Sequence, residues 1–208
     1  CAPSGGCRED FSMAGTRENI LMAAETLMQR QGYAGTSVDQ ICSEAGITKG
    51  AFFHYFSNKE AIGLAALEEF GGRVVGALFS APYMEEAEPV TRLFGYVDRM
   101  IEMCDAPALR DGCLVAMLTL EHASGSVTFR EKSAAAFDVW AAKSKELFEA
   151  AIESRGMSGR LDPGNLAHLF IAVFEGSLII RKAKEDSEIP KDNIRQLRKY
   201  LEMQLLDS

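Results

Sequence analysis

Apolar residues recur along most of this chain at intervals of three and four positions, which is the spacing of one face of an α-helix. Alternating apolar and polar residues, which mark a half-buried strand, are nearly absent. Proline, which interrupts helix interiors, does not occur between Ala14 and Ala81 or between Leu109 and Asp162. The pattern therefore predicts an all-α protein of about nine helices without a sheet.

The expected helices fall into two groups, separated by the break between Pro82 and Pro89. We place them at about 16–32, 37–45, 48–56, 57–79, 90–105, 112–123, 127–155, 164–184 and 191–206. Residues 1–12 contain glycine, serine and cysteine and little that could pack, so they are predicted to form a flexible leader. We expect residues 13–60 to form a first, small domain and residues 61–208 to form a larger helical one.

Composition and charge narrow the class of protein. The 208 residues are 47% apolar and 25% charged, as in ordinary globular proteins. A net charge of −8 excludes a surface that is basic throughout, although a small DNA-binding face remains compatible with it. The longest apolar stretch, Leu169 to Ile180, is interrupted by Glu175 and is shorter than the roughly 20 residues of a membrane span. Five cysteines without a CxxC pair, and no visible secretory signal, predict a cytoplasmic protein with no membrane partner.

The strongest functional signal is a pair of short expected helices within residues 36–56. Ser37 and Gln40 have capping-box spacing, Gly46 can end the first helix, and Thr48 can cap the second. Their inner face would be formed by Val38, Ile41, Ala45 and Ile47. This arrangement is typical of a helix-turn-helix.

The second of these helices carries five ring residues in succession, from Phe52 to Phe56. Because a helix turns by about 100° per residue, five consecutive side chains cannot share one buried face. Phe52 and Phe56 can point inward together, which leaves the rings between them outside. Exposed rings near lysines suit DNA, since rings contact thymine methyl groups and lysines neutralise phosphates. Residues 13–60 hold only four basic against five acidic residues, so a packing corner without DNA binding remains an alternative.

The run from Thr16 to Leu67 resembles the N-terminal domain of the TetR family of bacterial transcriptional regulators. The resemblance is carried by Gly35-Thr36-Ser37-Val38-Asp39-Gln40-Ile41 and by the segment from Ala45 to Glu60. It implies a homodimer that binds a palindromic double-stranded DNA operator. The residues that the resemblance places in the major groove are Thr48, Lys49, Gly50, Phe53, His54 and Tyr55, and those that it places at phosphates are Thr36, Ser37 and Lys59. Phe53 departs from the tyrosine that is common there, which removes one phosphate contact.

The rest of the chain has the length and proline layout of that family's ligand-binding and dimerisation domain. The apolar helices at about 164–206 are expected to pair with a second copy, or else to cover the core of their own monomer. An unknown small-molecule effector is expected inside this domain, although methionine and aromatic residues also occur in any core. The candidate lining residues are Met100, Met103, Cys104, Cys113, Met117, Glu121, His122, Trp140 and Phe174.

Cys113 follows Gly112 at an expected helix start, where the helix dipole favours the thiolate. The Gly-Cys pair is similar to a TetR subgroup in which some members sense electrophiles or oxidants through cysteine. The alternative is a small buried apolar side chain. The histidines show no ligand spacing with the cysteines, so neither a metal nor another cofactor is expected.

The favoured function is therefore a ligand-responsive DNA-binding repressor that is not an enzyme. A small all-α enzyme using Cys113 or the pair Glu121–His122 is one alternative, although no nucleophile–base–orienter pattern, phosphate loop or metal motif supports it. A helical module that docks a protein through the aromatic helix is the other.

Overall fold

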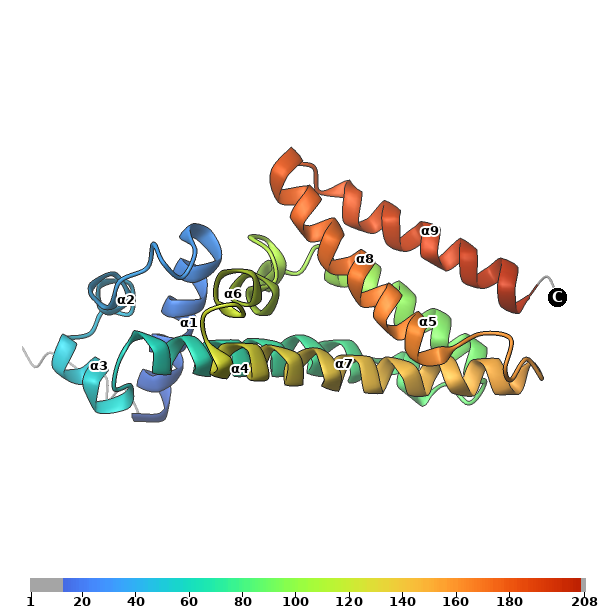
Figure 1. Cartoon of the computed structure of the whole chain (residues 1–208), viewed down its shortest axis with the longest axis horizontal. Coiled ribbons are helices and arrows are strands. Elements are labelled where there is room, and N and C mark those ends of the chain that lie inside the picture. The colour runs from blue at the N-terminus through green and yellow to red at the C-terminus, as the bar shows by residue number, and fades with distance from the viewer. Residues whose placement is uncertain (1–12, 207–208) are drawn as a thin grey trace, which may run out of the picture. The chain divides into compact units, whose positions relative to one another are not determined.

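The computed structural model describes residues 13–206, so the leader expected at residues 1–12 lies outside the described residues. Within the described range the chain forms nine α-helices and two short 3-10 helices, with a single isolated bridge between Ser158 and Leu161 in place of any strand. The predicted all-α fold is confirmed (Figure 1).

The helix bounds lie close to those expected from the sequence. They are α1 Met13–Gln31, α2 Val38–Glu44, α3 Lys49–Tyr55, α4 Lys59–Phe79, α5 Pro89–Met103, α6 Leu114–His122, α7 Val127–Ser154, α8 Pro163–Lys184 and α9 Glu188–Leu205, with the 3-10 helices η1 Pro82–Glu85 and η2 Pro107–Leu109. The two 3-10 helices were not expected. Both begin at a proline, which fits a first helical turn because its missing N–H would have no partner there. For the same reason α9 begins before Pro190 and not after it.

The chain divides into two compact units, Cys1–Ala66 and Leu67–Ser208. The division falls inside α4, whereas the domain limits proposed from the sequence, 13–60 and 61–208, cut the same helix nearer its start. Helix α4 therefore contributes its first turns to one unit and its remaining turns to the other.

The N-terminal unit has one small apolar core. Ile20 and Met28 of α1, Ile41 of α2, Phe52 of α3 and Ile62 of α4 are all buried in it. Each helix is short or amphipathic, so this shared core is what holds α3 in place.

The C-terminal unit is built around the 28-residue helix α7, which packs against α5, α6 and α8, while α9 packs against α5 and α8 (Figure 1). A buried polar network lies within it. The Tyr96 hydroxyl lies 2.8 Å from Ser144 Oγ, and Trp140 Nε1 donates to the Tyr96 oxygen at 3.0 Å. These bonds satisfy the polar ends of the large side chains that fill the core.

Helix α8 is long and apolar enough to cross a membrane by length and composition alone. The core helix of a globular protein passes the same test. Leu166, Phe170, Phe174 and Leu178 of α8 are buried in the C-terminal unit, so we interpret α8 as such a core helix.

Candidate nucleic-acid interface and effector cavity

Helices α2 and α3 are joined as the sequence predicts. Ser37 Oγ accepts from the Gln40 N–H at 3.2 Å, and Gln40 Oε1 accepts from the Ser37 N–H at 2.9 Å, which completes the capping box. Gly46 ends the first helix with φ +67°, a left-handed conformation that favours glycine. Thr48 Oγ1 accepts from the Ala51 N–H at 3.2 Å and caps α3. The start of each helix is therefore defined by its own side chain.

Helix α3 separates its ring residues into an inner and an outer set. Phe52 and Phe56 are buried, whereas Phe53 is 52% exposed, His54 is exposed and Tyr55 is half-buried. The inward and outward placement predicted from the helical turn is confirmed. Lys49 and Gly50, one turn earlier than Phe53 and His54, are also exposed, so these four residues form one outward face.

Lys49 on this face is already paired with a carboxylate. Its Nζ lies 2.6 Å from Asp39 Oδ1, and both side chains are largely exposed. The hydrogen bond to Asp39 raises the pKa of Lys49. Because exposed ion pairs are weak, Lys49 can exchange Asp39 for a phosphate.

Thr36 and Lys59 form hydrogen bonds to backbone carbonyls within this unit. This structural role was not predicted from the sequence. The Thr36 hydroxyl is buried and donates to the Gly32 carbonyl at 2.7 Å, so it is not available to a phosphate while that bond persists. Lys59 Nζ donates to the carbonyls of Tyr33 and Thr36 at 2.9 Å each, and it lies 4.2 Å from the centroid of the Tyr33 ring. Ser37, in contrast, is exposed at the start of α2.

The nine residues proposed for an effector pocket do not form one site. Met100, Met103, Cys104, Cys113, Trp140 and Phe174 are buried, Met117 and His122 are half-buried, and Glu121 is exposed. The ring of His122 stacks on that of Phe129, with ring centroids 4.7 Å apart. Only Cys113 and Trp140 line the same small inner cavity.

This inner cavity lies in the C-terminal unit and has a volume of about 20 Å³. Its walls come from α4, α7, α8 and the start of α6, and are formed by Phe70, Gly71, Val74, Val75, Cys113, Val115, Ala136, Phe137, Trp140 and Glu175. The charged residue among them, Glu175, is absent from the nine. The signal that could have found it is a lone carboxylate within the apolar stretch of α8.

The carboxyl group of Glu175 and the thiol of Cys113 form a pair shielded from solvent, although the Glu175 residue as a whole is half-buried. Burial raises the pKa of Glu175 to about 7, and a hydrogen bond from the Cys113 thiol partly offsets this effect. The other carboxyl oxygen, Oε1, is shielded from solvent and has no hydrogen-bond partner among the described residues. Buried polar atoms without a hydrogen-bond partner are rare in folded proteins, so each one calls for a specific explanation.

The prediction that the helix start favours the Cys113 thiolate is wrong. Cys113 is the N-cap of α6, one residue before the helix that was expected to contain it in its first turn; burial raises the pKa of its thiol well above the ordinary value, and the neighbouring Glu175 raises it further. The backbone amides of Val115 and Ala116 lower it, but their effect is smaller than that of burial. The effect of burial on the pKa of Cys113 is therefore larger than the opposite effect of the helix start.

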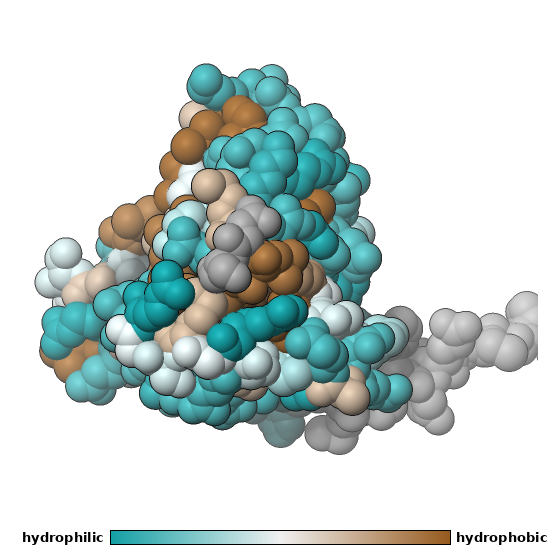
Figure 2. All heavy atoms as spheres, turned by 90° about the vertical axis from the view of Figure 1, so that its right-hand side faces the viewer, coloured by the Kyte–Doolittle hydropathy of each residue, from teal (hydrophilic) through white to brown (hydrophobic). Residues whose placement is uncertain are grey.

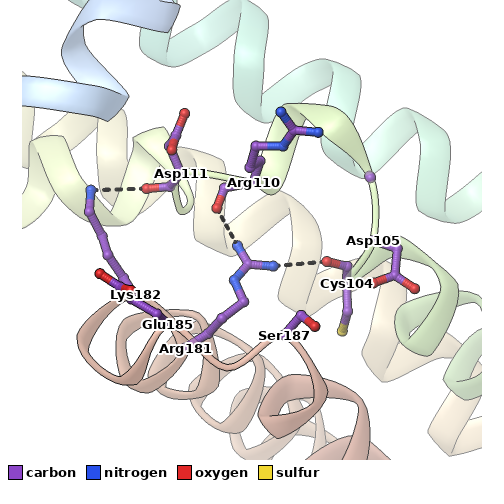
Figure 3. Close-up of a pocket in the computed structure, with 9 residues that line it drawn as sticks. Cys104, Asp105, Arg110, Asp111, Arg181, Lys182, Glu185 and Ser187 are labelled. Atoms are coloured by element: carbon purple, nitrogen blue, oxygen red, sulfur yellow. Dashed lines mark hydrogen bonds between the residues drawn. The ribbon is translucent and has the colours of Figure 1, made fainter.

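Cys104 lies at a separate hollow of about 450 Å³, near the connection between α5 and α6 (Figure 3). Burial raises the pKa of its thiol to about 11, and its Sγ donates to the Met100 carbonyl. The guanidinium of Arg181 points into the hollow and donates to the carbonyls of Cys104 at 2.8 Å and of Arg110 at 3.1 Å, and also to that of Leu109. Arg181 therefore holds this connection to α8.

An apolar groove of about 580 Å³ runs between α8 and α9. It is lined by Leu169, Val173, Gly176, Ser177, Ile180, Asn193, Gln196, Leu197 and Tyr200. In Figure 2, hydrophobic residues gather along one side of the upper part of the molecule, where α8 and α9 lie, and hydrophilic residues cover the other side. This groove falls within the segment 164–206 that was expected to pair with a second copy.

Two family models match the chain. The model described as bacterial regulatory proteins of the tetR family matches residues 20–66, and the model of a tetracyclin repressor-like C-terminal domain matches residues 89–197. The second match covers more than half of the chain.

Individual relatives agree with these matches. The chain is 29% identical to the transcriptional regulator AcuR of Cereibacter sphaeroides over 83% of this chain and 78% of that protein. It is 26% identical to the transcriptional repressor DhaR of a Mycobacterium species over 83% and 85%. The crystal structure of a TetR transcriptional regulator from Chloroflexus aurantiacus superposes with a TM-score of 0.80 at 25% identity, covering 91% of this chain and 95% of that one. A regulatory protein from Rhodobacter sphaeroides gives 0.74 at 27% identity, with 89% and 96% covered.

Proposed function

The chain belongs to the TetR family of bacterial regulatory proteins, and from this premise we propose that it is a ligand-responsive DNA-binding repressor of the cytoplasm. It binds a palindromic operator as a homodimer and leaves the operator when a small molecule binds the C-terminal unit. The matched relatives with assigned names are transcriptional regulators, among them a repressor.

The observation that carries the proposal is the outward face of α3. Removing an exposed phenylalanine ring from water against another apolar group is favourable, and Phe53 is 52% exposed. A thymine methyl group in the major groove is such a partner. Gly50 lets the backbone approach the bases, while Thr48, His54 and Tyr55 offer polar groups to bases and phosphates. Lys49 and Ser37 complete the phosphate contacts.

The groove between α8 and α9 is the proposed dimer interface. Leu169 and Ile180 are each 42% exposed along it, which is unfavourable for an isolated chain. A two-fold pairing of residues 164–206 would cover these side chains in both copies at once. A palindromic operator would require the two copies of α3 in the dimer to read half-sites about 34 Å apart.

The effector is proposed to act without forming a covalent bond. The raised pKa of Cys113 disfavours the thiolate, which is the reactive form of cysteine, so a thiol-reactive signal is the less favoured alternative. A ligand that prefers one conformation of the C-terminal unit by about 1–3 kcal/mol would change operator occupancy by about 5- to 150-fold. Helix α4, which has turns in both units, is the direct covalent route for such a change.

The test begins with genomic fragments selected by the full chain, followed by fluorescence anisotropy with the best fragment and with unrelated DNA. We expect selective binding that weakens between about 50 and about 200 mM salt. Phe53→Ala and Lys49→Ala should reduce affinity, and Lys49→Ala should lower the salt slope by about one. Leu120→Ala removes another exposed apolar side chain, on α6, and should leave affinity unchanged. Equal affinity for both DNAs, or an unaffected Phe53→Ala variant, would contradict the proposal.

A further inference from the structure

The inner cavity holds a carboxyl group whose charge nothing on the protein balances. No basic side chain pairs with Glu175 among the described residues, and its Oε1 has no hydrogen-bond partner there. The thiol of Cys113 is its polar neighbour in the cavity, and the other walls are apolar or aromatic. Resting on the function proposed above, we infer that this cavity recognises the effector, and that the effector is a small organic cation: a protonated amine on a compact apolar body.

The fold does not explain Glu175. An unpaired carboxyl group in an apolar interior lowers stability, and an apolar residue of similar size would avoid that penalty. A buried ionisable group that lines a cavity and has a perturbed pKa is a candidate for ligand recognition. Burial raises the pKa of Glu175 to about 7, so the group is largely ionised just above neutral pH, and a cation beside it would stabilise that charged form.

The aromatic walls favour a cation over other ligands. Phe70 of α4 and Phe137 and Trp140 of α7 line the same cavity as Glu175. The faces of aromatic rings attract ammonium groups, most strongly when both are removed from water. An anion would be repelled by Glu175, and a neutral ligand would leave its charge unbalanced.

The inner cavity alone is too small for such a ligand, since about 20 Å³ holds little more than one water molecule. A larger groove of about 550 Å³ lies beside it between α4 and α7. The two share Gly71, Val75 and Ala136 as walls. We place the ammonium group in the inner cavity and the apolar body in the outer groove.

The wall between groove and cavity is thin because it is made of small residues. A Cβ atom on Gly71 would lie 3.3 Å from Val115 Cγ2 and 3.5 Å from Ala136 Cβ, so even an alanine would press against these neighbours. The groove continues over Gly72 and Gly76, where a Cβ atom would meet open space. Two lysines stand at its rim: Lys132 pairs with Glu68, and Lys143 lies over the Phe79 ring. Since Glu68 is already paired with Lys132, we assign the selectivity for a cation to Glu175.

Occupation of this site would act directly on α4. Phe70, Gly71, Val74 and Val75 all belong to α4, and they face the ligand on one side. A ligand seated between α4 and α7 would displace α4, whose first turns belong to the DNA-binding unit. The same contact thus supplies both recognition and response.

The test uses the full chain and three ligands of the same shape and different charge: benzylamine, benzyl alcohol and benzoate, with methylamine and butylamine as smaller amines. Calorimetric titration at about pH 8 measures affinity without DNA, and anisotropy measures release of operator DNA. We expect benzylamine to bind at least about tenfold more tightly than its neutral and anionic counterparts. Glu175→Gln should remove this preference while leaving the affinity for benzyl alcohol unchanged.

Two further variants separate recognition from folding. Glu121→Gln removes an exposed carboxyl group of α6 outside the cavity and should behave as wild type. Gly71→Ala should weaken all amines larger than methylamine, while a melting curve confirms that it is folded. The inference is overturned if no amine binds saturably to the wild type, if the three benzyl ligands bind equally, or if Glu175→Gln binds benzylamine as well as wild type. Amine binding without DNA binding would instead overturn the proposed repressor function and leave the site intact.

Discussion

In the unit that ends at Ala66, three groups that hold the frame bond to partners between three and 26 positions away in the chain. The Thr36 hydroxyl reaches back four residues, the capping box spans three, and Lys59 reaches back 26. In the unit that begins at Leu67, some polar groups of the core, such as Ser144 and Ser177, bond within one helical turn, but others bridge much longer separations or lack a partner. Trp140 bonds Tyr96 across 44 residues, Arg181 bonds Cys104 across 77, and Glu175 Oε1 has no partner in the described structure.

This difference matches the two tasks proposed for the molecule. The DNA-binding unit must hold Phe53, His54 and Lys49 in one geometry. The hydrogen bonds within this unit fix the helices that carry them. A ligand-binding unit that responds to its ligand must have at least two arrangements of similar free energy. A ligand that pairs with an unsatisfied buried group stabilises one of these arrangements over the other. The comparison can be tested by removing polar groups from each unit and measuring what is lost.

The largest effect is expected for Arg181→Met in the C-terminal unit. The guanidinium bonds the carbonyls of Cys104, Leu109 and Arg110, and its loss would leave them unsatisfied at the edge of the hollow in Figure 3. We expect a loss of about 4 kcal/mol in the free energy of unfolding. Lys182→Met, which removes an exposed side chain and its bond to the Asp111 carbonyl, should lose less than about 1 kcal/mol. Equal midpoints for the two variants in urea would show that Arg181 is not a clamp.

The next effect is the pH dependence that Glu175 imposes. Its pKa is raised from 4.5 to about 7 in the folded chain, so the folded state holds the proton more tightly than the unfolded state. Stability should therefore fall as pH rises from about 4.5 through about 7, by up to about 3 kcal/mol. Glu175→Gln has no proton to lose and should lack this decline. Its stability relative to the wild type should therefore increase as pH rises. Urea unfolding at about pH 5 and pH 8 measures it, with Glu121→Gln as the exposed control.

A smaller loss is expected in the N-terminal unit for Lys59→Met. Two bonds, to the carbonyls of Tyr33 and Thr36, would be lost, but water can reach this partly exposed site and replace them. We expect the free energy of unfolding, measured by thermal unfolding, to fall by about 1–2 kcal/mol. Lys49→Met, which removes an exposed lysine from the same unit, should change stability by less than about 0.5 kcal/mol. If Lys59→Met also unfolds the C-terminal unit at lower temperature, the two units do not separate as described.

The same contrast explains what the sequence could predict. The Ser37 and Thr48 caps, Gly46 and the inward Phe52 and Phe56 depend on residues within one or two helical turns, and all are confirmed. Such features follow from helix geometry alone. In the C-terminal unit the helices could be predicted, but the cavity that their packing encloses could not.

The errors have the same physical origin. The pKa of Cys113 was expected to be low because it begins a helix, but the packing of α4, α7 and α8 around it raises that pKa instead. In the sequence, Glu175 stands out only as an interruption of an apolar run. Whether such a residue faces solvent or a cavity depends on helices far away in the chain, and no local pattern contains that information.

The smallest expected effect concerns the surface of the DNA-binding unit, where charge should alter function without altering stability. Asp39→Asn removes the partner of Lys49 while keeping a similar shape, and it should change the free energy of unfolding by less than about 0.5 kcal/mol because the pair is exposed. Lys49 would then be free for a phosphate, so operator affinity should rise by about 0.5–1 kcal/mol, or roughly two- to fivefold. Glu44→Gln removes the same formal charge elsewhere on α2. If anisotropy shows equal gains for both variants, the gain comes from net charge alone and Lys49 makes no specific contact; a larger gain for Asp39→Asn places Lys49 at the phosphate.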